Sequence, residues 1–199
     1  MTISREKRNA IERKGVPFIV TTLLRVFDIT ISDITLITDY QTQIKGVDYI
    51  LSNGLNKITV DSKYHKNIQK KQNTTVYGVD AISIEITNRY GYDGWGISKQ
   101  KDTDYIIDYI PDTAVYIIDA RALRTYLRQN YHMYPIWYSA EGKEQYRGVD
   151  IIDLLENNII VDYTADKCYM TELQEYALML QQTEDYRNII ETSVHNLQQ

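Results

Sequence analysis

The sequence predicts an α/β protein with a mixed or antiparallel sheet, and three patterns support this fold class. Residues 46–63 alternate apolar and polar side chains around an Asn-Gly pair, which is typical of a β-hairpin. Residues 81–87 alternate with the same period of two and so predict a further strand. Residues 119–130 and 169–197 carry apolar side chains at helical spacing. We therefore expect helices packed on a sheet.

The segment before the hairpin gives weaker signals. Residues 3–14 are polar, and we expect a short helix there that stops at Gly15 and Pro17. Residues 18–40 alternate irregularly, so they fit either a helix followed by a strand or two strands.

Further elements follow the strand at residues 81–87. Glycines and aromatic residues at 88–100 predict a connecting loop, and apolar runs at 104–110 and 114–118 predict two more strands. Asp119 is a suitable N-cap for a helix that reaches about Asn130.

The C-terminal third carries a second set of patterns. We expect a short helix at 150–157, an apolar run at 159–163, and helix over 169–197 with a break near Thr183. These patterns favour a domain at residues 1–130 and a mostly helical extension at 131–199 packed on the same domain.

Composition narrows the class of protein. The chain has 199 residues with 43% hydrophobic and 25% charged side chains, which is enough for a core of its own. Cys168 is the single cysteine, so no intramolecular disulfide can form, and no apolar run approaches the roughly 20 residues of a membrane helix. We expect a soluble cytoplasmic protein with no membrane partner.

The net charge of −5 argues mildly against a nucleic-acid partner. However, the charge is uneven, because residues 1–70 hold 11 Lys and Arg against 7 Asp and Glu, whereas residues 71–199 hold 11 against 20. Eighteen tyrosines are compatible with stacking surfaces for bases or with a simple codon bias, and codon bias is the simpler explanation.

The hairpin at residues 46–63 is the segment that indicates chemistry. A two-residue turn at Asn53-Gly54 would pair Tyr49 with Ile58 and Asp48 with Thr59. Opposed residues share a face, so the apolar and the polar side chains separate onto two faces. The core face would hold Val47, Tyr49, Leu51, Ile58 and Val60, and the other face Asp48, Ile50, Lys57, Thr59, Asp61 and Lys63.

This arrangement fits metal-assisted hydrolysis of a phosphodiester. Asp48 and Asp61 would be diagonal neighbours that can share one Mg²⁺ or Mn²⁺ ion, with the Ser62 carbonyl as a further ligand. Lys63, two residues after Asp61, could orient or deprotonate the attacking water and hold the phosphate. Glu85 in the next strand is the candidate for a further carboxylate in the site and for a metal ligand.

Asp48 and Asp61-Ser62-Lys63 resemble the signature of the PD-(D/E)XK nuclease superfamily. Gly46-Val47-Asp48, Glu85, Gly94-Trp95 and Lys101-Asp102-Thr103-Asp104-Tyr105 follow the order seen in small nuclease-like proteins of low-GC bacteria and their phages. The resemblance covers roughly residues 41–127 and lacks the initial proline. It implies a restriction-endonuclease-like core with a central mixed sheet flanked by helices, Mg²⁺ or Mn²⁺ dependence, and a DNA substrate for a deoxyribonuclease with Asp48, Asp61, Lys63 and Glu85 as catalytic residues.

Two other function classes stay open. A nuclease-fold protein without activity could bind another protein, for instance as a phage-encoded inhibitor, and the acidic C-terminal half would suit that role. Alternatively, the carboxylates could only order a loop in a structural component. A homodimer or a protein partner is compatible with either alternative. His132 and His195 show no zinc-ligand spacing, and Cys168 has no nearby histidine in the sequence, so we expect it to be structural. His65, just past Lys63, could assist a phosphate, but an ordinary surface histidine is the simpler interpretation.

Overall fold

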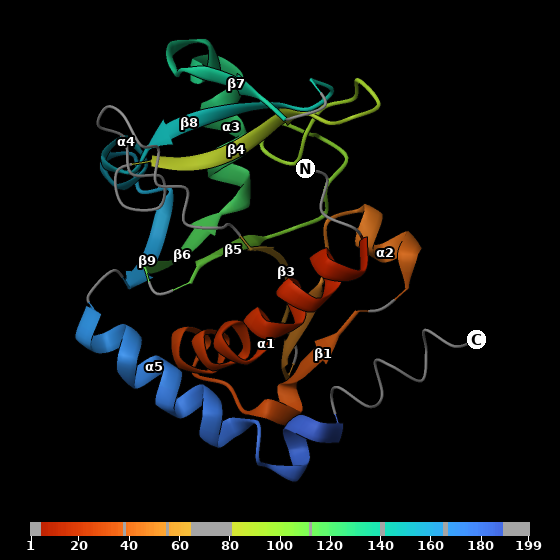
Figure 1. The fold of residues 1–199 in the computed structure, drawn as a ribbon, viewed down its shortest axis with the longest axis vertical. Helices are drawn as coiled ribbons and strands as arrows, with labels where there is room; N and C mark the ends of the chain where they lie inside the picture. Colours follow the sequence, from red (N-terminus) through yellow and green to blue (C-terminus); the bar gives the residue numbers. More distant parts are fainter. Residues whose placement is uncertain are drawn as a thin grey trace.

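The computed structural model describes residues 5–37, 39–54, 56–64, 81–111, 113–139, 142–164 and 167–188. Within these ranges the protein is α/β, with a mixed multi-stranded sheet flanked by helices, as predicted (Figure 1). No helix in these ranges is both long and apolar enough to cross a bilayer.

The main sheet has six strands in the order β1-β2-β3-β5-β6-β9. β3 and β5 run parallel, whereas the other neighbouring pairs run antiparallel, so the sheet is mixed. The strands are β1 (Ile34–Leu36), β2 (Tyr49–Asn53), β3 (Asn56–Tyr64), β5 (Tyr105–Ile110), β6 (Ala114–Asp119) and β9 (Ile160–Thr164).

A second, antiparallel sheet contains the strand predicted at residues 81–87. Its order is β4 (Ala81–Thr87), β8 (Gln145–Asp150) and β7 (Ile136–Tyr138). We expected β4 beside the hairpin in one sheet, but the parallel strand β5 occupies that position next to β3. β4 therefore belongs to a different sheet from the hairpin.

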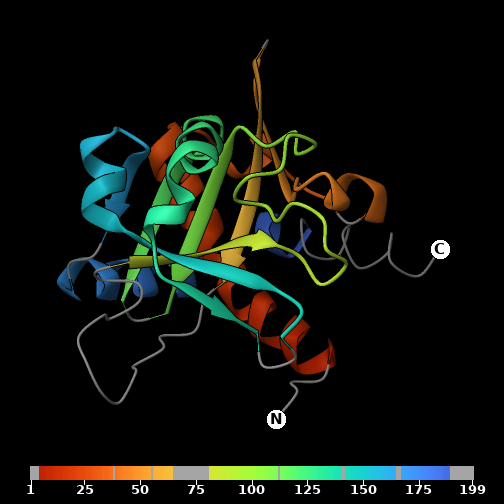
Figure 2. The ribbon, with the colours of Figure 1, turned by 90° about the horizontal axis from the view of Figure 1, so that it is seen from above.

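Helices cover both sides of the main sheet (Figures 1 and 2). α1 (Arg5–Phe27) packs on β3 and β5 and against α5 (Lys167–Leu180). On the other side, α3 (Ala120–Asn130) contacts β5 and β6, and α4 (Ile151–Glu156) contacts β8 and β9. The short α2 (Tyr40–Ile44) precedes β2, and 3₁₀ turns occupy Ile31–Asp33 and Tyr131–Met133.

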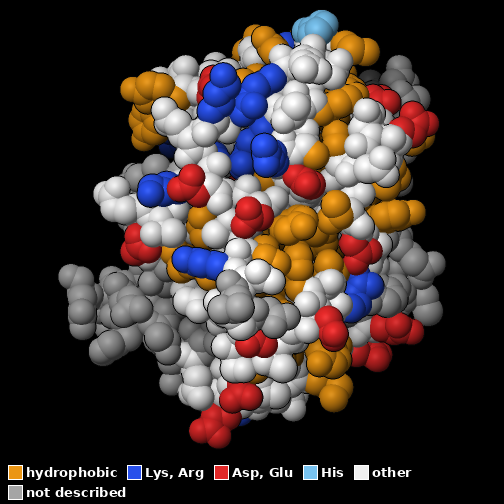
Figure 3. Space-filling model, turned by 180° about the vertical axis from the view of Figure 1, so that it is seen from behind, with side chains coloured by type: hydrophobic (Ala, Val, Ile, Leu, Met, Phe, Trp, Pro, Cys, Tyr) orange, Lys and Arg blue, Asp and Glu red, His pale blue; other side chains and the backbone are white. Residues whose placement is uncertain are grey.

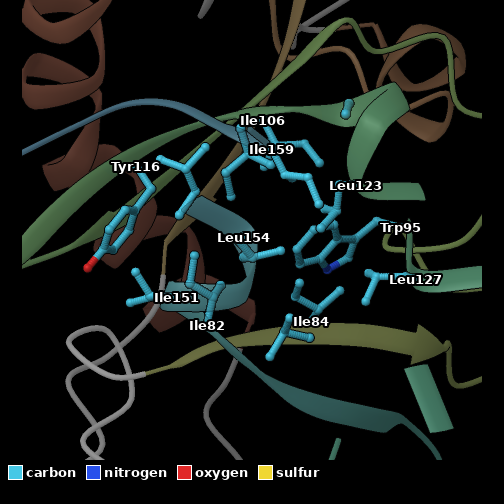
Figure 4. Close-up of a cluster of buried hydrophobic side chains, with 14 of the residues drawn as sticks. Ile82, Ile84, Trp95, Ile106, Tyr116, Leu123, Leu127, Ile151, Leu154 and Ile159 are labelled. Atoms are coloured by element: carbon cyan, nitrogen blue, oxygen red, sulfur yellow. The ribbon is translucent and has the colours of Figure 1, made fainter. Parts of the chain in front are cut away.

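Each side of the main sheet has its own hydrophobic core, because successive strand residues point to opposite faces. Ile107 of β5 faces α1, and Ile106 faces the layer of α3, α4 and the small sheet. In that second core the Trp95 ring lies among the aliphatic side chains of β4, α3 and α4 (Figure 4). The aliphatic residues labelled nearest to it are Ile84, Leu123, Leu127 and Leu154.

The hairpin has the predicted faces in a register displaced by two residues. Tyr49 pairs with Val60, where we expected Ile58, and Asn53 pairs with Asn56. The connection is therefore Gly54, with φ +61°, and the next residue, Leu55, which lies outside the described residues together with its predicted pairing to Ser52. Because a shift of two keeps every side chain on its face, Tyr49 and Val60 are buried as predicted.

α1 contradicts the helix end predicted at Gly15 and Pro17. The helix continues through both residues to Phe27. A Cβ atom on Gly15 would lie 2.7 Å from the Tyr64 ring, so glycine here allows the helix to approach β3 closely. Of the two alternatives for residues 18–40, a helix followed by a strand is the one observed.

The described part of residues 131–199 combines helices with the strands β7, β8 and β9. β7 and β8 were not predicted, and they pair with each other and with β4. The predictions at 150–157 and 159–163 correspond to α4 and β9, and helix returns at residues 184–188 after an interruption that includes Thr183. Residues 189–197 of the last predicted helix lie outside the described residues.

Candidate active site

Asp61 and Lys63 of β3 form an ion pair on the side of the small sheet. Asp61 pairs in register with Ile106, whose side chain belongs to the Trp95 core. The Lys63 Nζ atom lies 2.5 Å from Asp61 Oδ1, and the two side chains are 23% and 3% exposed. The structure thus brings this predicted pair together. Asp61 is far more buried than a carboxylate on the solvent-exposed face of a strand.

Asp61 has an unsatisfied oxygen. Its Oδ2 atom is buried and has no hydrogen-bond partner among the described residues. Burial raises the pKa of Asp61 to about 6, and the Asp48 charge adds to this shift, whereas Lys63 and Lys101 oppose it. Because a buried carboxylate oxygen without a donor is costly, its presence points to a functional role.

Lys63 remains an ammonium in this environment. Burial alone would lower its pKa, but the charges of Asp61, Asp48 and Glu85 hold the pKa above its usual value. The Nζ atom also lies 5.5 Å from the centre of the Trp95 ring, within the range of a cation–π contact. The site therefore keeps one fixed positive charge next to Asp61.

Asp48 reaches the site from the residue before β2. Its backbone N–H donates to the Val60 carbonyl, and its Oδ2 atom accepts from the Ser62 N–H at 2.9 Å and the Ser62 Oγ at 2.7 Å. The N–H and C=O of a strand residue leave the strand on the same side, so the Ser62 carbonyl opens toward Asp48. Two of the predicted metal ligands, Asp48 and Ser62, thus lie side by side on the side of β3 that faces β2.

Glu85 of β4 faces the same ion pair from the second sheet. Burial raises its pKa, the Trp95 backbone N–H and the charges of Lys63 and Lys101 lower it, and Glu144 raises it further. The loop glycines permit this arrangement. A Cβ atom on Gly94 would lie 2.4 Å from the Glu85 carbonyl oxygen, so any side chain there would displace Glu85.

Two cations of the site had no predicted role. Burial lowers the pKa of Lys101, and so do the charges of Lys63 and Arg124, whereas Asp61 and Glu85 oppose the shift. Arg124 of α3 is 5% exposed and donates to the carbonyls of Trp95, Lys101 and Thr103, at 3.2, 3.4 and 3.3 Å. It therefore fixes the loop that carries Lys101.

The sequence contained a signal for Arg124. This arginine lies three residues before Leu127, on the apolar stripe of α3, where a charged side chain must find buried partners. Lys101 belongs to the motif after Trp95, but only the folded loop shows that it approaches Asp61.

The metal ligands predicted from the sequence come together only in part. Among the described side chains, no three His, Cys, Asp or Glu groups lie close enough to hold a metal ion, so Glu85 does not complete a cluster with Asp48 and Asp61. Two carboxylates and a carbonyl still fit Mg²⁺, which commonly uses one or two protein carboxylates and keeps several waters. The unpartnered Asp61 Oδ2 atom is the observation that favours a cation here.

The described residues include one of the three histidines and the single cysteine. His132 is exposed in the 3₁₀ turn after α3, and His65 and His195 lie outside the described residues. Cys168 belongs to the first turn of α5, on the opposite side of the main sheet.

Comparisons with models of known protein families, with curated proteins and with solved structures find no match to this chain.

Proposed function

We propose that the protein is a metal-dependent deoxyribonuclease of the PD-(D/E)XK kind, with a restriction-endonuclease-like core. The observation that carries the proposal is the ion pair between buried Asp61 and partly buried Lys63, in which one Asp61 oxygen has no partner among the described residues. Glu85, Lys101 and Arg124 surround this pair with further charges. Such a cluster of buried and partly buried charges costs stability and is typical of catalytic sites.

Asp48, Asp61 and the Ser62 carbonyl would hold a Mg²⁺ or Mn²⁺ ion. When bound, the ion supplies Lewis-acid stabilisation of the phosphate and a more acidic water. The Ser62 N–H and hydroxyl fix the orientation of the Asp48 carboxylate. Asp61 presents its Oδ2 atom as the ligand, because its Oδ1 atom already accepts from Lys63.

Lys63 acts as a positioned cation. Its raised pKa keeps it protonated near neutral pH, so it is suited to hold a phosphate oxygen and to orient water, and not to remove a proton. Lys101 adds a second positive charge on the same side, where an anionic substrate would be held.

A cleavage assay with a matched pair of lysine variants tests the proposal. The purified protein is incubated with plasmid, linear duplex and single-stranded DNA in Mg²⁺ or Mn²⁺. We expect the wild type to cut DNA and Lys63→Ala to cut about 10² to 10⁴ times more slowly, because a positioned electrostatic group is lost. Lys57→Ala, which removes an exposed lysine from the same strand, should cut normally.

Two results would contradict the proposal. If the wild type cuts none of these DNA forms with either ion, the protein is no deoxyribonuclease under these conditions. If Lys63→Ala cuts as fast as the wild type, the activity resides at another site.

A second candidate function is supported by two features of the same site. Lys63 closes directly onto Asp61, and the described carboxylates do not form a cluster of three. We propose as the alternative a catalytically silent nuclease fold that binds or inhibits another protein. A wild type that neither cuts DNA nor binds Mn²⁺ in calorimetry would favour this alternative.

A further inference from the structure

Two tyrosines project into solvent next to the candidate site. Tyr90 is 77% exposed and Tyr92 is 71% exposed, in the segment that directly follows β4 and its Glu85. Large aromatic side chains this exposed leave most of their ring surface without a protein partner. Their faces are therefore free to stack on a ligand.

The turn that carries these tyrosines is well fixed. The Asn88 Oδ1 atom accepts from the backbone N–H groups of Tyr90 and Tyr92, at 2.9 and 3.1 Å. The Asn88 N–H donates to the Tyr92 carbonyl, and a β-bridge joins Thr87 to Asp93. A fixed turn places both rings with little loss of backbone entropy on binding.

A third exposed tyrosine, Tyr138 of β7, lies at the same end of the small sheet. Tyr138 pairs with Gln145 of β8, and Gln145 pairs with Thr87 of β4, so these three residues lie in one row across the sheet. Arg89 also bonds Glu144 at 3.1 Å and ties the turn to the segment before β8. This end of the sheet thus presents aromatic surface on a rigid base.

A path of positive charge leads from the turn to the site. After Asp93 the chain runs along α3, where Arg124 bonds the Trp95 carbonyl and Arg128 bonds the Ile97 carbonyl. It then passes the exposed Lys99 and reaches Lys101, next to Asp61. Arg121 and Arg128 are exposed on α3 itself.

A space-filling view is consistent with this path of positive charge. Figure 3 shows several Lys and Arg side chains gathered below the histidine at the top of the view, with hydrophobic side chains beside them. Acidic side chains also lie on this face, so the basic area is bounded. Asp93, at the end of the turn, is one exposed carboxylate close to the tyrosines.

We propose that this surface binds single-stranded DNA, with unpaired bases stacked on Tyr90 and Tyr92 and the phosphate backbone along Lys99, Arg128 and Lys101. Stacking on aromatic rings combined with a cationic path is the usual means of holding single strands. In a duplex the base faces are covered by their neighbours, so the tyrosines would gain little. The inference names the substrate form of the deoxyribonuclease proposed above and rests on that function.

Binding measured without cleavage tests the inference. Fluorescence anisotropy with a labelled 20-nucleotide oligo-dT in EDTA compares the wild type with Tyr90→Ala/Tyr92→Ala. The dissociation constant of the double variant should be at least about tenfold higher, because each base stacked on an aromatic ring contributes to the binding free energy. Tyr90→Phe/Tyr92→Phe should bind like the wild type, because the rings remain. Tyr176→Ala, an exposed tyrosine on α5, should also leave binding unchanged.

The inference is overturned if the wild type does not bind oligo-dT, or binds a 20-base-pair duplex or oligo-rU more tightly. Unchanged binding by the double alanine variant would overturn it as well. Its failure is distinguishable from that of the proposed activity. If the protein cuts only duplex DNA, the nuclease proposal stands and the single-strand inference is wrong. If oligo-dT binding depends on the tyrosines but no DNA is cut, the single-strand binding surface stands and the nuclease proposal is wrong.

Discussion

Asp61 differs from an ordinary strand carboxylate in three respects at once. It is almost fully buried, it bonds a lysine two residues away, and one of its oxygens has no partner among the described residues. Since burial disfavours the charged form, the folded protein holds a proton on Asp61 more tightly than the unfolded chain does. The same residue therefore links the proposed chemistry to stability.

The first prediction concerns pH. The pKa of Asp61 is raised to about 6 from 3.8, so its contribution to stability is fully present below about pH 3.8 and is lost as the pH rises through about 6. Relative to Asp61→Asn, the wild type should lose roughly 3 kcal/mol of unfolding free energy across this window, at about 1.4 kcal/mol per pKa unit. Urea unfolding of both proteins between pH 4 and 7 measures the difference. Parallel pH profiles would mean that Asp61 titrates normally.

The second prediction concerns Gly46, two residues before Asp48. Gly46 has φ +76°, and a Cβ atom there would lie 3.0 Å from both Lys101 Cδ and Thr103 Oγ1 and 3.4 Å from Asp61 Oδ2. Gly46→Ala should therefore combine backbone strain of about 1–3 kcal/mol with crowding of the site, and should reduce both stability and DNA cleavage.

Gly54→Ala is the matched control for this change. Gly54 also has a positive φ, +61°, but a Cβ atom there would meet nothing within 4 Å. This variant should show strain alone and keep its activity. If both variants lose the same stability and the same activity, the space around Gly46 has no special role.

Among the helices and strands, the periodicity of the sequence predicted the features that are set by local residues. The hairpin faces and the helix capped by Asp119 are confirmed, since the Asp119 side chain accepts from the Ala122 N–H. The two-residue shift in register and the continuation of α1 through Pro17 were missed. Both depend on tertiary packing, as the close approach of Gly15 to Tyr64 illustrates.

The site was predicted in part for the same reason. Asp48, Asp61 and Lys63 lie in one hairpin, so spacing alone indicated their proximity. Lys101 and Arg124 come from a loop and a helix whose positions are set by long-range packing, and no local pattern contains that information. Glu85 was expected from a neighbouring strand of the same sheet, yet it comes from the other sheet.

The third prediction tests how α3 fixes the loop from Trp95 to Thr103. Arg124→Met removes the donor to three carbonyls while keeping much of the apolar volume. It should cost about 2–5 kcal/mol, because buried acceptors lose charged donors. Hydrogen exchange should rise in residues 95–103 and DNA cleavage should fall, because Lys101 loses its position. Arg121→Met, exposed on the same helix, should leave hydrogen exchange in residues 95–103 unchanged, and equal exchange in both variants would contradict this role for Arg124.

Across the whole molecule, the site draws its charged groups from both sheets. β3 brings Asp61 and Lys63 from the main sheet, β4 brings Glu85 from the small one, and the α3 layer lies beside both (Figure 2). The charges of the site thus hold their mutual positions only when both sheets are packed. A ligand that binds these groups should therefore favour the folded state of the whole domain.

The last prediction uses this coupling to test the metal site. Mn²⁺ that binds Asp48, Asp61 and the Ser62 carbonyl in the folded state should raise the unfolding free energy by about 2.7 kcal/mol at a free concentration one hundred times its dissociation constant. Calorimetry gives that constant, and thermal unfolding with and without Mn²⁺ gives the shift. In Asp61→Ala the shift should vanish, because the variant lacks the buried Oδ2 atom proposed as a metal ligand. Glu156→Ala, which removes an exposed carboxylate at the end of α4, should keep the full shift. Equal Mn²⁺ affinity in the wild type and in Asp61→Ala would place the ion away from β3 and leave Asp61 with a purely electrostatic part in the site.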